Sequence, residues 1–180
     1  MSSIRATALA FDRVMARADQ SMWVVTTIAD GHRAGCLVGF GTQVGIEPRR
    51  FLACLSKTNH TYGVASRARY LAVHLLDAGT GALAQLFGAE TGSEVDKFEH
   101  CDWHEGPHSL PILDAAAGCF AGEILRHDDF GDHVGFLMAP TWAQVGAADA
   151  SPMRYDAVED LPPGHPAGSD AKDIEASDSD

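Results

Sequence analysis

Short runs of β-branched and aromatic residues, each bounded by turn residues, constrain the fold of this chain more than any other feature. The clearest run covers residues 22–29 (MWVVTTIA), and Asp30-Gly31 follows it, a dipeptide typical of tight hairpin turns. Residues 34–40 then fit the returning strand of that hairpin. Further strands are predicted at residues 51–55, 70–76, 115–125 and 133–145.

Helical spacing of apolar residues is confined to a few stretches. Ile4, Ala8, Phe11 and Met15 recur at steps of three and four, which predicts a helix at the start of the chain. Shorter helices are expected at residues 60–69 and 82–87, whereas residues 88–110 read as irregular. About six strands with few long helices fit an antiparallel barrel or sandwich better than alternating β-α units. The predicted fold class is therefore mainly β, with a few short peripheral helices.

Charge divides the chain into two unequal parts. The 180 residues carry a formal net charge of -12, of which -7 lies in residues 149–180, where nine acidic residues accompany two basic ones. This segment is also rich in Pro and Gly, so it cannot bury enough apolar surface to offset its ordering entropy. We predict one folded domain over residues 1–148 and a disordered acidic tail over residues 149–180 that is dispensable for folding.

The same composition argues against several classes of protein. The acidic excess disfavours nucleic-acid binding. No run is apolar for long enough to span a bilayer, and charged residues interrupt any secretory signal near the start. The four cysteines show no CxxC spacing and are read as reduced thiols. A cytoplasmic location without a membrane partner is therefore expected.

Two short motifs point to chemistry that their surroundings do not support. Residues 104–108 (HEGPH) match the HExxH pattern of zinc proteases, which requires both histidines on one helix face. Pro107 disfavours that helix by about 3 kcal/mol, so a loop is expected and no metal site is assigned. Residues 39–45 (GFGTQVG) nearly match a dinucleotide-binding GxGxxG, but the last glycine is displaced by one and Pro48 follows. No GxSxG nucleophile elbow is present.

Several stretches, taken in order, resemble the flavin reductase-like family of FMN-binding split barrels. They are residues 11–15, 22–27 (MWVVTT), 30–35, 47–48 (EP), 51–57 (FLACLSK), 71–76 (LAVHLL), 96–98 (DKF), 103, 110–113 (LPIL) and 131–133 (GDH). The glycine-rich loop departs from the family pattern because hydroxyl side chains are largely missing there, and it is similar to the actinobacterial-type branch. The resemblance implies a Greek-key antiparallel split β-barrel that binds FMN, with FAD as the alternative cofactor and NAD(P)H as co-substrate.

Two segments supply the residues expected to hold the flavin. Residues 56–61 (SKTNHT) follow a strand and place a cation among hydroxyl, amide and imidazole donors, which suits a phosphate, although a polar surface turn is the alternative reading. With the resemblance, the expected flavin contacts are Gly35, Cys36, Leu37, Val38, Thr42, Gln43, Ser56, Lys57, Asn59, His60 and Thr61. The resemblance also places His133 near the flavin and nicotinamide. Hydride transfer needs alignment rather than a strong base, so its expected role is positioning or charge balance.

Three functions are compatible with these residues. The resemblance favours an NAD(P)H-dependent flavin reductase that supplies reduced flavin to a monooxygenase. The altered loop leaves open a flavin- or deazaflavin-binding oxidoreductase with another electron donor, and also a non-catalytic flavin-binding module whose acidic tail meets a protein partner. The resemblance further implies a homodimer with the flavin near the subunit interface.

Overall fold

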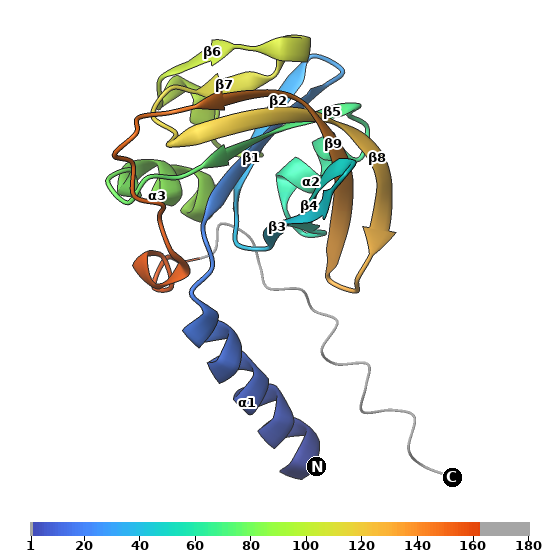
Figure 1. The fold of residues 1–180 in the computed structure, drawn as a ribbon, viewed down its shortest axis with the longest axis vertical. Helices are drawn as coiled ribbons and strands as arrows, with labels where there is room; N and C mark the ends of the chain where they lie inside the picture. Colours follow the sequence, from blue (N-terminus) through green and yellow to red (C-terminus); the bar gives the residue numbers. More distant parts are fainter. Residues whose placement is uncertain (1, 163–180) are drawn as a thin grey trace.

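The computed structural model of the protein describes residues 2–162, and its main body is a seven-stranded antiparallel sheet (Figure 1). The strand order is β2-β1-β5-β8-β9-β4-β3. The strands are β1 (Trp23–Ala29), β2 (His32–Val38), β3 (Gly41–Ile46), β4 (Arg49–Ser56), β5 (Tyr70–Leu75), β8 (Gly118–Asp129) and β9 (His133–Val145). A small second sheet pairs β6 (Trp103–Glu105) with β7 (Pro111–Leu113). The predicted mainly β fold is confirmed.

The large sheet curls until strands far apart in its order meet. Just beyond β2, the carbonyl oxygen of Phe40 accepts a 2.9 Å hydrogen bond from the backbone N–H of Cys54 in β4. Two register shifts bend the long β8–β9 hairpin around the body. At the first shift, a Cβ on Gly122 would lie 2.6 Å from the carbonyl oxygen of Ala139, so only glycine allows this approach. The result is a barrel that remains split along one side.

Local turn chemistry explains the two tight hairpins. In the β1–β2 turn, Asp30 and Gly31 have φ angles of 52° and 76°, the left-handed conformation that a two-residue hairpin loop requires. In the β8–β9 turn, Gly131 has a φ of 105°, and Phe130 N–H donates to the carbonyl oxygen of His133. The predicted hairpin after residue 29 is confirmed.

Helices decorate the outside of the sheet. They are α1 (Ser2–Ala18), α2 (His60–Ala65) and α3 (Gly81–Ala89), joined by three 3-10 turns at Lys97–Glu99, Pro107–Ser109 and Tyr155–Ala157. All three predicted helices are confirmed. Two expectations were wrong: residues 88–110 are not irregular throughout, because β6 forms there, and the predicted glycine-rich loop at residues 39–45 largely belongs to β3.

Two apolar clusters form most of the core. One fills the barrel and consists of Val25, Cys36, Val38, Phe51, Ala53, Leu55, Ala65, Leu71, Val73, Val134, Phe136 and Met138. The other lies between the sheet and α3 and consists of Met22, Val24, Leu76, Leu83, Ala84, Phe87, Phe98, Leu113, Met153 and Val158. Cys36 and Val38 of β2 belong to the barrel cluster, and their packing fixes the position of the β2 backbone.

Packing continues past residue 148, where the sequence predicted the domain to end. Met153 is buried, its carbonyl oxygen accepts from Met22 N–H, and its own N–H donates to Leu76. Val158 is also buried in the cluster beneath α3. The first part of the predicted tail, residues 149–162, is therefore built into the domain. The remainder, residues 163–180, lies outside the described residues.

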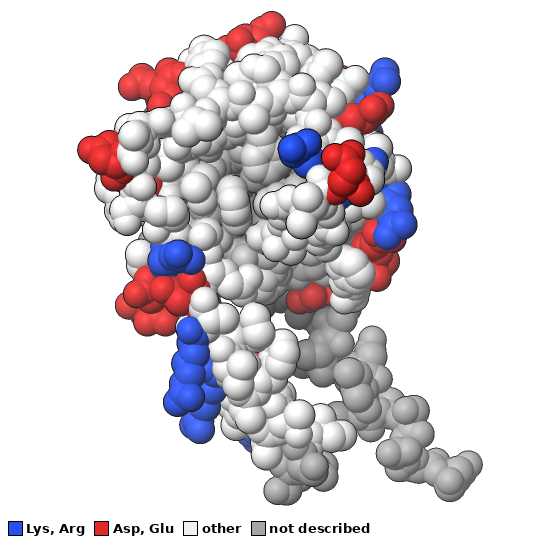
Figure 2. Space-filling view, in the orientation of Figure 1, with Lys and Arg blue, Asp and Glu red and all other residues white. Residues whose placement is uncertain are grey.

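Helix α1 projects away from the barrel (Figure 1). Its apolar side chains face solvent: Ile4 is 81% exposed and Phe11 is 62% exposed. Figure 2 shows mostly uncharged residues over its visible surface, with basic residues gathered along one side. No helix within residues 2–162 has the length and apolar character needed to cross a membrane.

Candidate functional site

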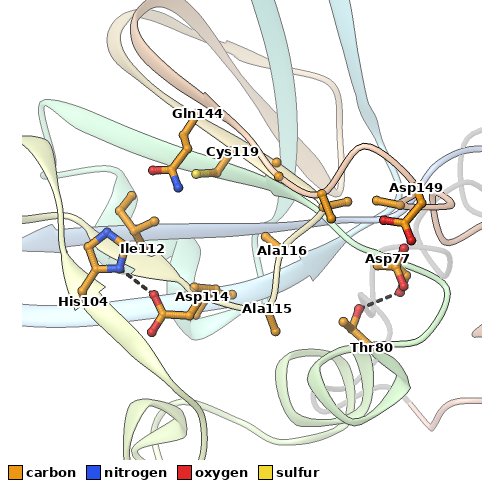
Figure 3. Close-up of a pocket in the computed structure, with 16 residues that line it drawn as sticks. Asp77, Thr80, His104, Ile112, Asp114, Ala115, Ala116, Cys119, Gln144 and Asp149 are labelled. Carbon is orange, nitrogen blue, oxygen red and sulfur yellow. Dashed lines mark hydrogen bonds and ion pairs between the residues drawn. The ribbon is translucent and has the colours of Figure 1, made fainter.

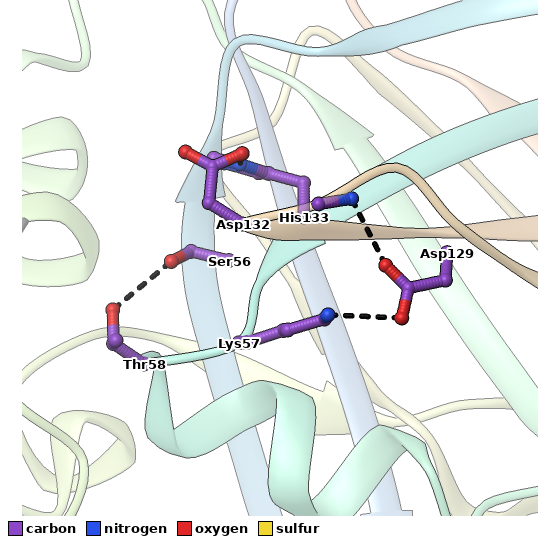
Figure 4. Close-up of polar contacts among 7 residues, drawn as sticks. Ser56, Lys57, Thr58, Asp129, Asp132 and His133 are labelled. Atoms are coloured by element: carbon purple, nitrogen blue, oxygen red, sulfur yellow. Dashed lines mark hydrogen bonds and ion pairs between the residues drawn. The ribbon is translucent and has the colours of Figure 1, made fainter. Parts of the chain in front are cut away.

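The polar turn between β4 and α2 is built by its own side chains. Asn59 caps α2, because its Oδ1 accepts a 2.8 Å hydrogen bond from Thr61 N–H. The hydroxyls of Ser56 and Thr58 lie 3.0 Å apart on the outer side of the turn (Figure 4). α2 is only six residues long, so its helix dipole adds little to this turn.

The β8–β9 hairpin docks against this turn. Lys57 N–H donates to the carbonyl oxygen of Asp132 at 2.9 Å, and Lys57 Nζ lies 2.9 Å from Asp129 Oδ2 (Figure 4). The hydrogen bond from Lys57 holds the pKa of the Asp129 carboxyl below its usual range. Asp129 also accepts from Gly131 N–H, so it shapes the hairpin turn as well. The sequence interpretation missed Asp129, because no spacing rule links residues 57 and 129.

His133 lies at the start of β9, opposite Ser56 in the strand register. Its Nδ1 donates to Asp132 Oδ1 at 2.9 Å, and this bond lowers the pKa of the Asp132 carboxyl. The His133 ring also meets the ring of Phe40 edge to face, with centroids 5.2 Å apart. Carboxylate and aromatic ring together fix the orientation of the imidazole.

A cavity of about 110 Å³ opens where β2, β4 and His133 meet. It is lined by Cys36, Leu37, Val38, Gly39, Phe40, Cys54, Leu55, Ser56, Asn59 and His133. Six of the residues predicted to bind flavin or to act on it therefore come together here, and Lys57 adjoins them through the turn.

The other predicted contacts lie elsewhere. Gly35 and His60 line a cavity of about 620 Å³ between β2, α2 and residues 92–98. Thr42 and Gln43 line a third cavity of about 640 Å³ at the end of the barrel. Thr61 is buried and its side chain hydrogen-bonds the Cys36 thiol, so its hydroxyl faces the core.

The Cys36 thiol is an unreactive core group. Burial raises its pKa to about 11, and the opposing effects of Thr61 and Lys97 are smaller. A neutral, inaccessible thiol is a poor nucleophile. Cys36 can thus contribute to the site only through its backbone.

The side chain of Lys97 is hydrogen-bonded to the free edge of β2. It is buried, and its Nζ donates to the carbonyl oxygens of Gly35 at 3.2 Å and Phe87 at 3.1 Å. Desolvation lowers the Lys97 pKa. Because the Gly35 carbonyl points away from β1, the peptide groups of Leu37, two residues on, face the same open side. Leu37 also lines the cavity beside His133, whereas Gly35 and Lys97 line the cavity of about 620 Å³.

An acidic cavity of about 420 Å³ lies on a different part of the surface (Figure 3). His104 Nδ1 and Asp114 Oδ1 are 2.6 Å apart in it, while Asp77 accepts from Gly79 and Ser151 N–H groups. None of the predicted flavin contacts lines this cavity. His104 is on β6, whereas His108 is in a 3-10 turn and stacks on Tyr70, so the HExxH string does not form a helical metal site.

These features define an antiparallel split barrel with a small cavity where β2, β4 and the start of β9 meet. Residues 15–159 match the family described as "Flavin reductase like domain". FMN reductase (NADH) RutF from Ancylobacter novellus is 31% identical over 154 residues, covering 83% of this chain and 84% of the relative. The chain belongs to the flavin reductase-like family.

Two solved structures share the fold. The flavin reductase domain protein from Arthrobacter sp. FB24 is 23% identical, with a TM-score of 0.74, over 91% of this chain and 98% of that chain. The NADH:FAD oxidoreductase SgcE6 from Streptomyces globisporus C-1027 is 26% identical, with a TM-score of 0.69, and the match covers 78% of this chain and 86% of that chain. The predicted family and split-barrel fold are confirmed.

The donor set of this site fits FMN. Hydroxyl groups of Ser56 and Thr58 and the half-exposed cation of Lys57 suit the phosphate. The open edge of Leu37 suits the polar edge of a flat ring, and Phe40 supplies an apolar wall. A cavity of about 110 Å³ is nevertheless well below the roughly 300–1,000 Å³ of typical cofactor sites.

Proposed function

We propose that the protein is an FMN-binding flavin reductase that transfers hydride from NAD(P)H to the flavin. The convergence of the β2 edge, the residue 56–61 turn and His133 on one cavity carries the proposal. The family match over residues 15–159 and the relative named as an NADH-dependent FMN reductase support it. The flavin, when bound, supplies the redox chemistry.

The chain's own residues bind and orient. Ser56, Lys57 and Thr58 hold the phosphate, and the peptide groups of Leu37 hydrogen-bond the polar edge of the ring. His133, braced by Asp132, orients the nicotinamide against the ring rather than removing a proton, because hydride transfer needs alignment.

A homodimer completes the site in this proposal. The small volume of the cavity and the exposed apolar side of α1 both support burial by a second copy. A reductase that releases reduced flavin also needs a consumer, and a monooxygenase is the proposed partner class. Light scattering with and without FMN measures the molar mass of the protein in solution. The mass of a monomer in both conditions would contradict the proposed homodimer.

The function is tested by mixing the protein anaerobically with FMN and either NADH or NADPH and following the blue absorbance of oxidised flavin. Bleaching faster than in the protein-free control is expected, and the faster donor identifies the coenzyme. FMN binding without bleaching by either donor would instead favour a deazaflavin or another donor, or a non-catalytic module.

The phosphate contact has a sharper test. Lys57→Met should raise KM for FMN roughly tenfold, because a charge-assisted hydrogen bond is lost, while KM for riboflavin, which lacks the phosphate, stays unchanged. Arg126→Met removes a cation from the neighbouring hairpin and should alter neither value. Equal changes for FMN and riboflavin would refute the role of Lys57.

A further inference from the structure

The cavity of about 640 Å³ at the end of the barrel takes no part in the proposed flavin chemistry. It lies where β1, β3 and β4 begin, and within the described residues it shares no lining residue with the cavity beside His133. Its volume falls within the roughly 300–1,000 Å³ typical of small-molecule sites. It is therefore large enough for a separate ligand.

Three aromatic side chains form the floor of this cavity. The ring centroids of Trp23 and Phe51 are 5.3 Å apart, and those of Phe51 and Phe120 are 5.0 Å apart, both edge to face. Such contacts hold the rings in place before any ligand arrives. A Cβ on Gly41 would lie 3.1 Å from Trp23 Cδ1 and 3.2 Å from Phe51 Cζ, so glycine keeps this wall flat.

The indole N–H of Trp23 is an orphan donor. It is shielded from solvent and has no hydrogen-bond acceptor within residues 2–162. The atom bonded to it, Cδ1, lies against Gly41 in the cavity wall. Because this nitrogen is shielded from solvent, it lies behind the cavity wall and does not face the open part of the cavity.

The rim of the cavity is cationic. Arg49 and Arg50 stand at the start of β4, opposite Ile46 and Gly45 of β3, and both line the cavity; the Arg50 guanidinium donates to the carbonyl oxygen of Arg49 at 2.7 Å. No carboxylate is among the described lining residues, although the chain carries a net charge of -12. Guanidinium groups pair with carboxylates and also stack on aromatic faces. An apolar floor beneath two arginines therefore favours a ligand that carries both an aromatic ring and a carboxylate.

We propose that this cavity binds a planar aromatic anion, with its ring on Trp23, Phe51 and Phe120 and its carboxylate toward Arg49 and Arg50. The apolar helix α1 of a second copy is the competing occupant. That helix carries three arginines and one aspartate, so it would bring like charges to the same rim. Charge complementarity favours the anion.

Equilibrium dialysis of the full-length protein against 2-naphthoate tests the proposal, with the uncharged 2-naphthamide as matched ligand. One naphthoate per chain is expected to bind, roughly tenfold tighter than the amide. The double variant Arg49→Gln and Arg50→Gln should abolish this difference while the amide still binds. The control Arg126→Gln, on the β8–β9 hairpin, should bind as the unmodified protein does.

Three results would overturn the proposal. Competition between naphthoate and saturating FMN would place the ligand in the flavin site. Equal affinities for acid and amide, or no effect of the double variant, would remove the role of the arginines. Naphthoate binding that weakens as protein concentration rises would show that a second copy occupies the cavity. Circular dichroism of each variant establishes that it is folded.

Discussion

Protonation of His74 is expected to cost the fold about 3 kcal/mol as the pH falls from 6.5 to 4. The side chain is fully buried in β5. Its Nδ1 donates to the carbonyl oxygen of Val24 at 3.0 Å, and its Nε2 accepts from Leu113 N–H at 3.2 Å. The neutral ring thereby joins β1, β5 and β7 with one donor and one acceptor.

The magnitude follows from the shift of the His74 pKa. Burial lowers it from 6.5 to about 4, although the hydrogen bond to Val24 opposes the effect. Each pKa unit corresponds to about 1.4 kcal/mol, so a shift of roughly 2.5 units gives about 3 kcal/mol. Since the folded pKa is depressed, this stability is present above pH 6.5 and is lost as the pH falls through 4.

Urea unfolding at about pH 7.5 and about pH 4.5 measures the effect, with His74→Gln and the exposed His100→Gln as a matched pair. At the higher pH, His74→Gln should be less stable by about 1–3 kcal/mol, because a buried partner is left unsatisfied. At the lower pH the unmodified protein should lose most of about 3 kcal/mol relative to His74→Gln, so the difference in free energy of unfolding should disappear or change sign, whereas His100→Gln should follow the unmodified protein.

If the difference in free energy of unfolding between His74→Gln and the unmodified protein stays constant with pH, the predicted role of His74 is refuted. Nitrogen NMR of the unmodified protein gives an independent check. It should find the His74 ring neutral and protonated at Nδ1 at about pH 6. A charged His74 ring at that pH would also refute the predicted pKa shift. This check uses the unmodified protein, so it holds even if His74→Gln does not fold.

Other predictions concern packing. Gly35→Ala should destabilise the protein by about 1–3 kcal/mol in urea unfolding, because its Cβ would lie 2.7 Å from Phe87, while Gly63→Ala in α2, with nothing within 4 Å, should stabilise it by up to about 1 kcal/mol. Truncation after residue 148 should lower the melting temperature, because it removes the buried side chains of Met153 and Val158. Mass spectrometry should find Cys36 the last thiol to react with an alkylating reagent, and early labelling would contradict its burial.

Local sequence determined the elements that were predicted correctly. The β1–β2 hairpin needs only a β-branched run and two residues that tolerate positive φ, and both are visible at residues 22–31. β3 and β6 were missed because their residues have weak strand propensity and form strands through their partners. The tail beyond residue 148 was judged by its charge, while a few apolar residues such as Met153 decide its packing.

The residue pattern alone pointed to the candidate site only where its residues are close in sequence, whereas residues 36–38 and His133 were placed by the family resemblance. Residues 56–61 were found because donors cluster there, and the structure brings Ser56 and Asn59 to the cavity beside His133. Thr42 and Gln43 were grouped with the flavin contacts by their place in the loop, yet β3 carries them to the end of the barrel.

Lys97 illustrates what sequence alone could not supply. As part of a DKF string it contributed to the family resemblance, and as an isolated lysine it would be read as a solvated charge. In the fold, its ammonium bridges the carbonyl oxygens of β2 and α3, which lie 62 and 10 residues away in the chain. The Gly35 carbonyl faces the same edge of β2 as the peptide groups of Leu37, because the pairing of β2 with β1 sets this alternation. The cation that bridges β2 and α3 thus lies on the strand edge on which the proposed flavin contacts depend.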